Sequence, residues 1–129
     1  MIEANELRIG NYVSFKFMRI KEVVKIQCIN KELIGVRESV YGYDKIKLIP
    51  LREEWLIKFG FSKSEDKINE NSNYYNTTEY WIQEHIDVDD FIFYGKNNSI
   101  ELVIKHVHEL QNLYFALTGK ELVAPVDPK

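Results

Sequence analysis

The chain has 129 residues, 45% hydrophobic and 13% aromatic, which is enough for one compact unit with its own core. The single cysteine, Cys28, excludes an internal disulfide and a four-cysteine zinc site, and we expect it to be a small buried hydrophobe on a strand. No apolar run reaches the ~18 residues of a membrane span, and residues 1–6 do not resemble a signal peptide, so we expect a cytoplasmic protein.

The net charge of −3 is divided unevenly along the chain. Residues 1–50 carry nine Lys/Arg and six Asp/Glu, a net charge of +3, whereas residues 51–129 carry eight and fourteen, a net charge of −6. Duplex DNA binding normally requires a concentrated basic stripe, and these lysines are scattered. We therefore do not expect nucleic acid as a partner, and weak binding by the first half is kept only as an alternative.

The first fifty residues predict short strands joined by tight turns. Alternating apolar side chains indicate a strand at 12–17, and a second, longer strand is expected at 20–29. Further strands are predicted at 33–37, where Gly35 indicates a bend or bulge, and at 45–49, with residues 41–44 as a loop. This series of short strands joined by tight turns is typical of a small SH3-like curled β-sheet or barrel.

A helix and a β-meander are predicted next. Residues 51–61 form a linking helix that follows Pro50, has a glutamate pair in its first turn and ends at a glycine. The polar segment 62–78 is expected to be a mobile loop or a long hairpin tip. Strands expected at 80–86, 91–94 and 100–104 complete an antiparallel meander.

The final predicted element is an amphipathic helix over 106–119, stopped by Gly119. On a helical wheel, apolar residues from Val107 to Leu117 form one arc, which we expect to pack on the meander. Phe115 lies off this arc, beside His108 and Gln111, so it needs a second surface to cover it. That cover is the tail through Leu122 or Val123, a second copy of the chain, or a ligand.

The expected architecture is therefore α+β, as a single compact unit over residues 1–129. Its parts are a β-rich subdomain at 1–50, the linking helix at 51–61, the meander with its helix at 62–122, and a loose tail at 123–129.

Few motifs point to chemistry. No Gly-rich phosphate loop or Gly-x-Ser-x-Gly elbow occurs, so neither a catalytic residue nor a cofactor is expected. The best metal candidates are His85, Asp87 and Asp89, which alternation aims to one side, although an Asp-rich turn explains them equally simply. His106 and His108 chelate one ion only if the backbone there is extended.

An aromatic cluster lies near the polar segment. It consists of Tyr74, Tyr75, Tyr80 and Trp81, and with Lys63 and Lys67 it offers a nucleobase a stacking site. Acidic neighbours argue against a polyanion there, so packing is the favoured interpretation.

Three segments resemble a family of small proteins of Bacteroidota, their phages and mobile elements. The residues that carry the resemblance are Asn5–Val13, Ile49–Phe61 and Lys105–Leu122, in that order, and the closing segment, KHVHELQNLYFALTGKEL, is the most specific. The family implies one unit spanning the chain and an accessory role inside the cell. It implies no reaction, so no functional residue is carried over.

We therefore expect a non-enzymatic binding or adaptor protein that binds a protein partner or itself. Alternatives are a protein that sequesters a small nucleotide signal and a divalent-metal enzyme using the His85 to Asp90 cluster. The residues predicted for the partner or ligand surface are His108, Gln111, Phe115, Arg37, Tyr41 and Tyr43.

Overall fold

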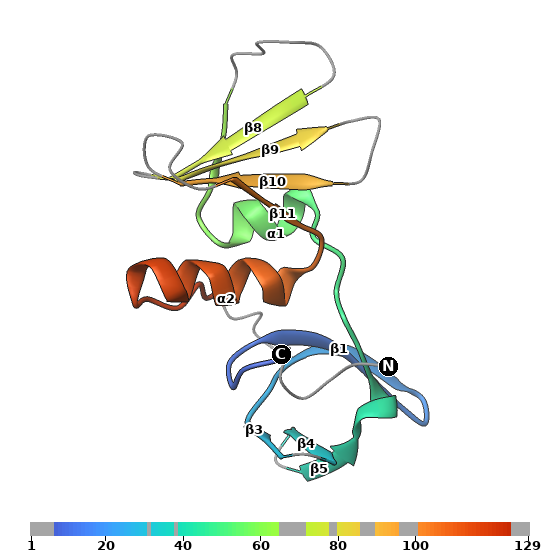
Figure 1. Ribbon diagram of the computed structural model, residues 1–129. Coiled ribbons are helices and arrows are strands. Elements are labelled where there is room, and N and C mark those ends of the chain that lie inside the picture. Colours follow the sequence, from blue (N-terminus) through green and yellow to red (C-terminus); the bar gives the residue numbers. More distant parts are fainter. Residues whose placement is uncertain are drawn as a thin grey trace. The chain divides into compact units, whose positions relative to one another are not determined.

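Antiparallel strands and two α-helices make up an α+β fold in the computed structural model (Figure 1). The structure describes residues 7–30, 32–37, 39–64, 72–77, 80–85, 90–95 and 101–124. The chain forms two units, which are described separately: unit 1 comprises Met1–Pro50 and His106–Glu121, and unit 2 comprises Leu51–Lys105 and Leu122–Lys129.

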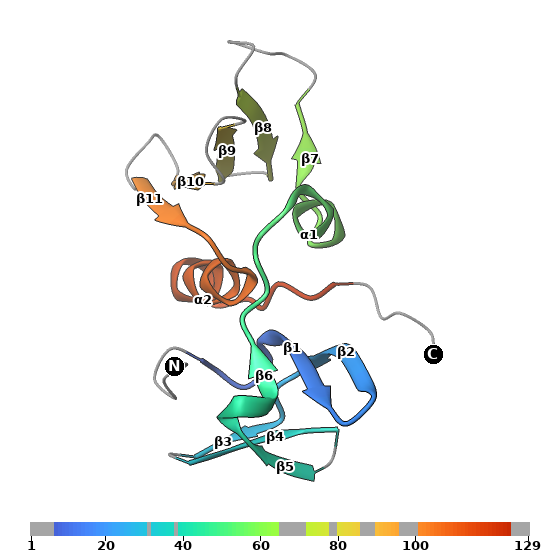
Figure 2. The same cartoon turned by 90° about the vertical axis from the view of Figure 1, so that its right-hand side faces the viewer.

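Unit 1 contains two three-stranded antiparallel sheets, which Figure 2 shows as two layers. The first has the order β2-β1-β6, with β1 at Tyr12–Phe17, β2 at Ile20–Lys25 and β6 at Ile46–Lys47. The second has the order β3-β4-β5, with β3 at Cys28–Ile29, β4 at Leu33–Val36 and β5 at Ser39–Gly42. A 3-10 turn, η2 at Tyr43–Lys45, follows β5.

One hydrophobic core lies in this unit. Its fully or nearly buried members come from both sheets, the segment before β1 and the link between β2 and β3: Leu7, Val13, Phe15, Ile26, Ile34, Val36 and Ile46. Neither sheet is closed or curled, so the expected SH3-like curled sheet or barrel is replaced by two small sheets. The alternation that predicted β1 is confirmed, because Val13 and Phe15 are both fully buried.

The single long strand expected at 20–29 is wrong, because the chain changes partners at Ile26. The N–H of Ile26 donates to the carbonyl of Asn11 (2.9 Å), whereas the N–H of Gln27 donates to the carbonyl of Gly35 (2.7 Å). The chain therefore leaves one sheet and enters the other. Residues 41–44 were expected to be a loop, but Tyr41 and Gly42 belong to β5.

Cys28 also departs from its expected place, because it is exposed rather than buried. It lies directly opposite Gly35 in the β3–β4 pair, where a Cβ on residue 35 would collide with the present position of the Cys28 Sγ. A side chain at residue 35 would therefore force the Cys28 side chain to turn away, and the bend or bulge expected there is replaced by regular pairing.

Unit 2 contains a five-stranded antiparallel sheet of order β11-β10-β9-β8-β7 and helix α1. The strands are β7 at Ser62–Lys63, β8 at Ser72–Asn76, β9 at Trp81–His85, β10 at Phe91–Tyr94 and β11 at Glu101–Ile104. The expected meander is confirmed. Of the two interpretations of residues 62–78, the structure favours the hairpin, because β7 pairs with β8. Residues 65–71, between these strands, lie outside the described residues.

The core of unit 2 lies on one face of this sheet. It includes Tyr75, Ile82 and Phe93, all 0% exposed, and helix α1 at Glu53–Lys58 contributes Trp55 and Leu56. Leu51 and Phe59, which flank this helix, are buried too.

Helix α2 spans Val107–Thr118, as predicted. The N–H of His106 donates to the Glu109 carboxylate (2.9 Å), and Gly119 ends the helix in the left-handed region at φ 74°. The helix was expected to pack on the meander, but it packs against β1 and belongs to unit 1 (Figure 1).

Candidate binding surfaces

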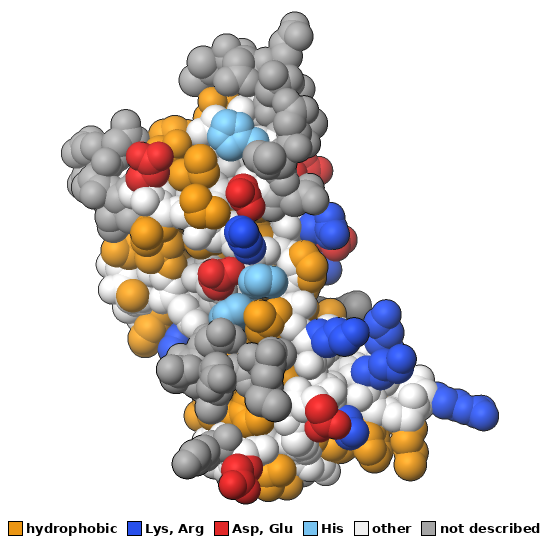
Figure 3. Space-filling view, turned by 45° about the vertical axis from the view of Figure 1, so that its right-hand side comes forward, with side chains coloured by type: hydrophobic (Ala, Val, Ile, Leu, Met, Phe, Trp, Pro, Cys, Tyr) orange, Lys and Arg blue, Asp and Glu red, His pale blue; other side chains and the backbone are white. Residues whose placement is uncertain are grey.

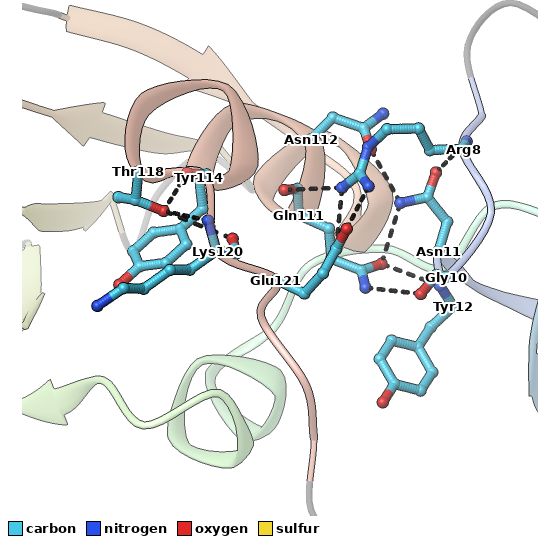
Figure 4. A network of polar contacts seen from close by, with 10 residues as sticks. All are labelled: Arg8, Gly10, Asn11, Tyr12, Gln111, Asn112, Tyr114, Thr118, Lys120 and Glu121. Carbon is cyan, nitrogen blue, oxygen red and sulfur yellow. Dashed lines mark hydrogen bonds and ion pairs between the residues drawn. The ribbon is translucent and has the colours of Figure 1, made fainter.

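A network of polar contacts docks α2 on β1 (Figure 4). The buried Gln111 amide donates from Nε2 to the carbonyl of Gly10 (3.1 Å) and accepts at Oε1 from the N–H of Tyr12 (2.9 Å). At the start of β1, the Gln111 side chain thus makes the two hydrogen bonds that the backbone of a neighbouring strand would make. Gln111 contacts β1 from outside the predicted apolar arc, because its amide satisfies two backbone groups. The arc itself is buried at Val107 and Leu110, both 0% exposed.

Arg8 connects the same region to the end of the helix. Its guanidinium donates to Asn112 Oδ1 (2.9 Å) and to both carboxylate oxygens of Glu121 (2.6 and 3.1 Å). The guanidinium carbon also lies 4.5 Å from the centre of the Phe115 ring. Phe115 remains 39% exposed, with the Arg8 guanidinium over its ring, and the three covers expected for it stay predictions.

The structure places the first half of the predicted partner surface on α2. His108 is buried at 5% exposed, and its ring lies 5.8 Å from that of His106. Gln111 is fully buried and bonded to β1, so of these three helix residues Phe115 alone is exposed.

The second half of that predicted surface lies on the β3-β4-β5 sheet and the turns beside it. Arg37 forms an ion pair with Glu22 (2.6 Å), and the ring of Tyr41 packs 4.8 Å from that of Phe15. The Tyr43 hydroxyl donates to the carbonyl of Asn30 (2.7 Å), and burial raises its pKa. Each of the three side chains therefore has a partner inside unit 1.

The metal candidates are only partly visible. His85 ends β9, whereas Asp87 and Asp89 lie outside the described residues. Within the described ranges, no group of three His, Cys, Asp or Glu side chains could hold a metal ion. His106 caps α2 through Glu109, whose Oε1 lies 2.9 Å from its Nδ1.

The outer face of the five-stranded sheet carries a row of aromatic rings. Paired residues of antiparallel strands share a face, and alternate residues face opposite sides. The register therefore puts two rows on the face opposite the core: Tyr74, Gln83, Ile92 and Val103, and beside them Asn76, Trp81, Tyr94 and Glu101. We call Tyr74, Trp81, Ile92, Tyr94 and Val103 the aromatic face.

The rings of the aromatic face are fixed by one another. Trp81 and Tyr94 stack with centroids 3.9 Å apart and planes at 11°, and Tyr74 lies 5.6 Å from Trp81 at 45°. The Tyr94 hydroxyl donates to Gln83 Oε1 (3.1 Å). Their faces are largely occupied, so the rings present edges and hydroxyl groups rather than a stacking platform.

The predicted aromatic cluster is divided between the two faces. Tyr75 points into the core, and Tyr80 packs 5.5 Å from Phe93, whereas Tyr74 and Trp81 belong to the aromatic face. Lys63 shares the core face with Tyr75 and forms an ion pair with Glu53 (2.8 Å), while Lys67 lies outside the described residues. Sequence reasoning saw these rings but missed Tyr94, whose partnership depends on the register.

A polar cluster closes the other side of the sheet. The Tyr75 hydroxyl lies 2.7 Å from Glu53 Oε1 and 3.0 Å from Glu84 Oε1. Burial, with the two carboxylates, raises the pKa of Tyr75 far above its ordinary value of 10.0. The hydrogen bonds from Lys63 and Tyr75 lower the pKa of Glu53. Lys63 thus supplies one positive charge beside Glu53, and the cluster is suited to holding α1 on the sheet.

No family model, curated protein or solved structure matches the chain. Among the described residues, neither helix is long and apolar enough to cross a membrane.

Proposed function

We propose that this chain is a non-enzymatic protein-binding adaptor that binds its partner through the aromatic face. The observation that carries the proposal is a row of partly exposed Trp and Tyr rings on the side of the sheet opposite the core. Tyrosine and tryptophan are enriched at the energetic centres of protein interfaces, where a rigid ring buries area at little entropic cost.

The composition of the aromatic face favours a protein over a nucleotide. Glu101 is the charged residue within the two rows. Burial is the main cause of the raised pKa of Tyr94, and the nearby Glu101 carboxylate raises it further. A phosphate is repelled by that carboxylate, and the stacked Trp81–Tyr94 pair leaves little free ring surface for a base. Val103, 54% exposed on the edge strand β11, extends the apolar area to the rim of the sheet.

Site-specific photo-crosslinking tests the proposal directly. A benzophenone amino acid replaces Val103 in one variant and Ile57 in the other, because Ile57 is a similarly exposed (49%) apolar residue on α1. Both variants are expressed in a Bacteroidota host, the group whose small proteins the sequence resembles. We expect a discrete protein adduct from position 103, and its loss when Trp81→Ser is added.

The mass of the adduct distinguishes self-association from binding of a different protein. An adduct with a second copy of the chain identifies self-association, and an adduct of another mass identifies a different protein; both support the aromatic face. Equal labelling from positions 57 and 103, or an adduct that survives Trp81→Ser, overturns the proposal, provided that circular dichroism shows the Trp81 variant to be folded.

A further inference from the structure

The register of the first sheet gathers lysines that are scattered in the sequence. Lys16 lies directly opposite Lys21, Ser14 lies between Val23 and Lys47, and Tyr12 lies opposite Lys25. Alternation places all of these residues on the side of the sheet opposite the core residues Val13 and Phe15. We call Lys16, Lys21, Lys25 and Lys47, with Tyr12 beside Lys25 at one end of the strands, the basic face.

Among the residues that the structure describes, no acidic side chain neutralises the basic face. All four lysines are exposed, and none forms an ion pair with another described residue. The acidic residue of β2, Glu22, lies on the opposite side, where it pairs with Arg37 at 2.6 Å. Blue Lys and Arg side chains gather toward the lower right of Figure 3, over unit 1.

The basic face also carries an aromatic ring at one end and an apolar side chain nearer its middle. Tyr12 is half-buried, its ring points away from α2 in Figure 4, and the Lys25 Nζ lies 5.6 Å from its centre. Val23 beside it is 52% exposed. Alternate residues of a strand are about 7 Å apart, so Lys21 and Lys25 lie roughly 13 Å from each other along β2.

We propose that the basic face binds single-stranded nucleic acid. Lysines act as point charges for backbone phosphates, and a tyrosine within a basic sheet face provides a ring on which an unpaired base stacks. A duplex hides its bases from such a ring, and its major groove admits a helix or a two-stranded ribbon rather than a three-stranded sheet. The overall charge of −3 does not oppose binding, because the acidic excess belongs to residues 51–129.

The expected affinity depends strongly on salt. If each of the four lysines contacts one phosphate, the slope of log K against log salt is about −2.8 for a single strand. Raising the salt from 50 to 200 mM then weakens binding about 50-fold, whereas two contacts predict a loss of only about sevenfold.

The experiment is fluorescence anisotropy of the full chain with labelled oligo(dT) and oligo(U) of about twenty nucleotides, across that range of salt. Lys16→Gln with Lys21→Gln removes two charges and relieves a like-charge pair, so folding is not impaired. The matched control, Lys58→Gln with Lys120→Gln, removes the same charge outside the basic face. Tyr12→Leu tests the ring, and we expect at least about fivefold weaker binding with the salt slope unchanged.

Binding of either oligonucleotide, with a slope that halves in the Lys16/Lys21 variant and is retained in the control, supports the proposal, and the tighter oligonucleotide identifies DNA or RNA. Equal weakening in both double variants overturns it, since the effect is then one of net charge. Tighter binding to a duplex of the same length, or to vesicles containing phosphatidylglycerol, overturns the assignment to single strands, as does absence of binding at 50 mM salt.

Discussion

The hydroxyl of Tyr75 lies between two carboxylates, although it has one proton to donate. It is within hydrogen-bond distance of Glu53 and Glu84, and Lys63 supplies the compensating charge at Glu53. A buried phenol with two acceptors strongly resists ionisation, because the phenolate would lie beside two negative groups. The residue therefore links the stability of unit 2 to pH at both ends of the scale.

We expect unfolding of the protein to become easier above pH 10 because of Tyr75. Its pKa is raised in the folded state, so its contribution is complete below the unfolded value of 10.0 and declines as the pH rises beyond it. Tyr75→Phe should lower stability near pH 7 and flatten the dependence between pH 10 and 12. Urea unfolding across that range is the measurement, and an unchanged slope in the variant contradicts this role.

The acidic side of the same cluster has the opposite sign. The lowered pKa of Glu53 means that its contribution is complete above its ordinary value of 4.5 and is lost as the pH falls through the folded value. Loss of the Tyr75 hydroxyl removes one of the hydrogen bonds that cause this shift, so Tyr75→Phe should also reduce acid sensitivity.

At the scale of elements, α2 is held on β1 by two kinds of polar contact that contribute differently to the free energy of unfolding. The Arg8–Glu121 pair is partly exposed (29% and 39%), and such pairs contribute about 0–1 kcal/mol. The Gln111 amide is fully buried, and its loss removes the hydrogen bonds that it makes with the N–H of Tyr12 and the carbonyl of Gly10. Each buried unsatisfied group costs about 1–3 kcal/mol.

We therefore predict that Gln111→Met lowers the free energy of unfolding by about 2–4 kcal/mol, whereas Glu121→Gln lowers it by less than about 1 kcal/mol. Urea titration of both variants gives the comparison. Faster hydrogen exchange at the Tyr12 amide should accompany the first substitution and not the second. If the two variants are equally destabilised, the docking depends on surface charge instead.

Elements with a strong local signal were predictable. β1 appears with the expected bounds, because alternation marks it. α2 appears within one residue of the expected bounds at each end, because helical spacing and a terminal glycine mark it. β8 was only foreseen as part of a hairpin, since Asn-rich flanks conceal the buried Tyr75. The partner change at Ile26 was not foreseen, because both of its flanking stretches favour strand and only the pairing distinguishes them.

The whole molecule joins distant parts of the sequence. Unit 1 is made of Met1–Pro50 and His106–Glu121, so its strands are completed by a helix synthesised more than fifty residues later. Helix α2 resembles a meander helix in the sequence because it directly follows β11. Chain order is a good guide to neighbours, yet the N–H of Tyr12 in β1 donates to the side chain of Gln111, about a hundred residues away.

A chain ending at Lys105 should therefore lose the protection of β1 although every residue of the first two sheets is present. A chain ending at Glu121 keeps α2 and serves as the matched control. Hydrogen exchange at the β1 amides distinguishes them, and we expect fast exchange in the first and slow exchange in the second. Equal protection in both would show that the two small sheets fold without the helix.

Both candidate surfaces depend on register, and this limits what the sequence alone reveals about function. The aromatic face combines residues 74, 81 and 94, and the basic face combines residues 16, 21, 25 and 47, each set from three strands. The residue types were visible in the sequence, but a shift of one residue in pairing would move each side chain to the other face.

The exposed thiol of Cys28 has a practical consequence for any study of assembly. In air, two molecules can couple through their sulfur atoms and give a covalent pair that imitates a native dimer on a sizing column. Cys28→Ser or a reductant in the buffer removes this artefact. The same atom, unique in the chain, accepts a maleimide dye, so a fluorophore can be attached at one defined position without further engineering.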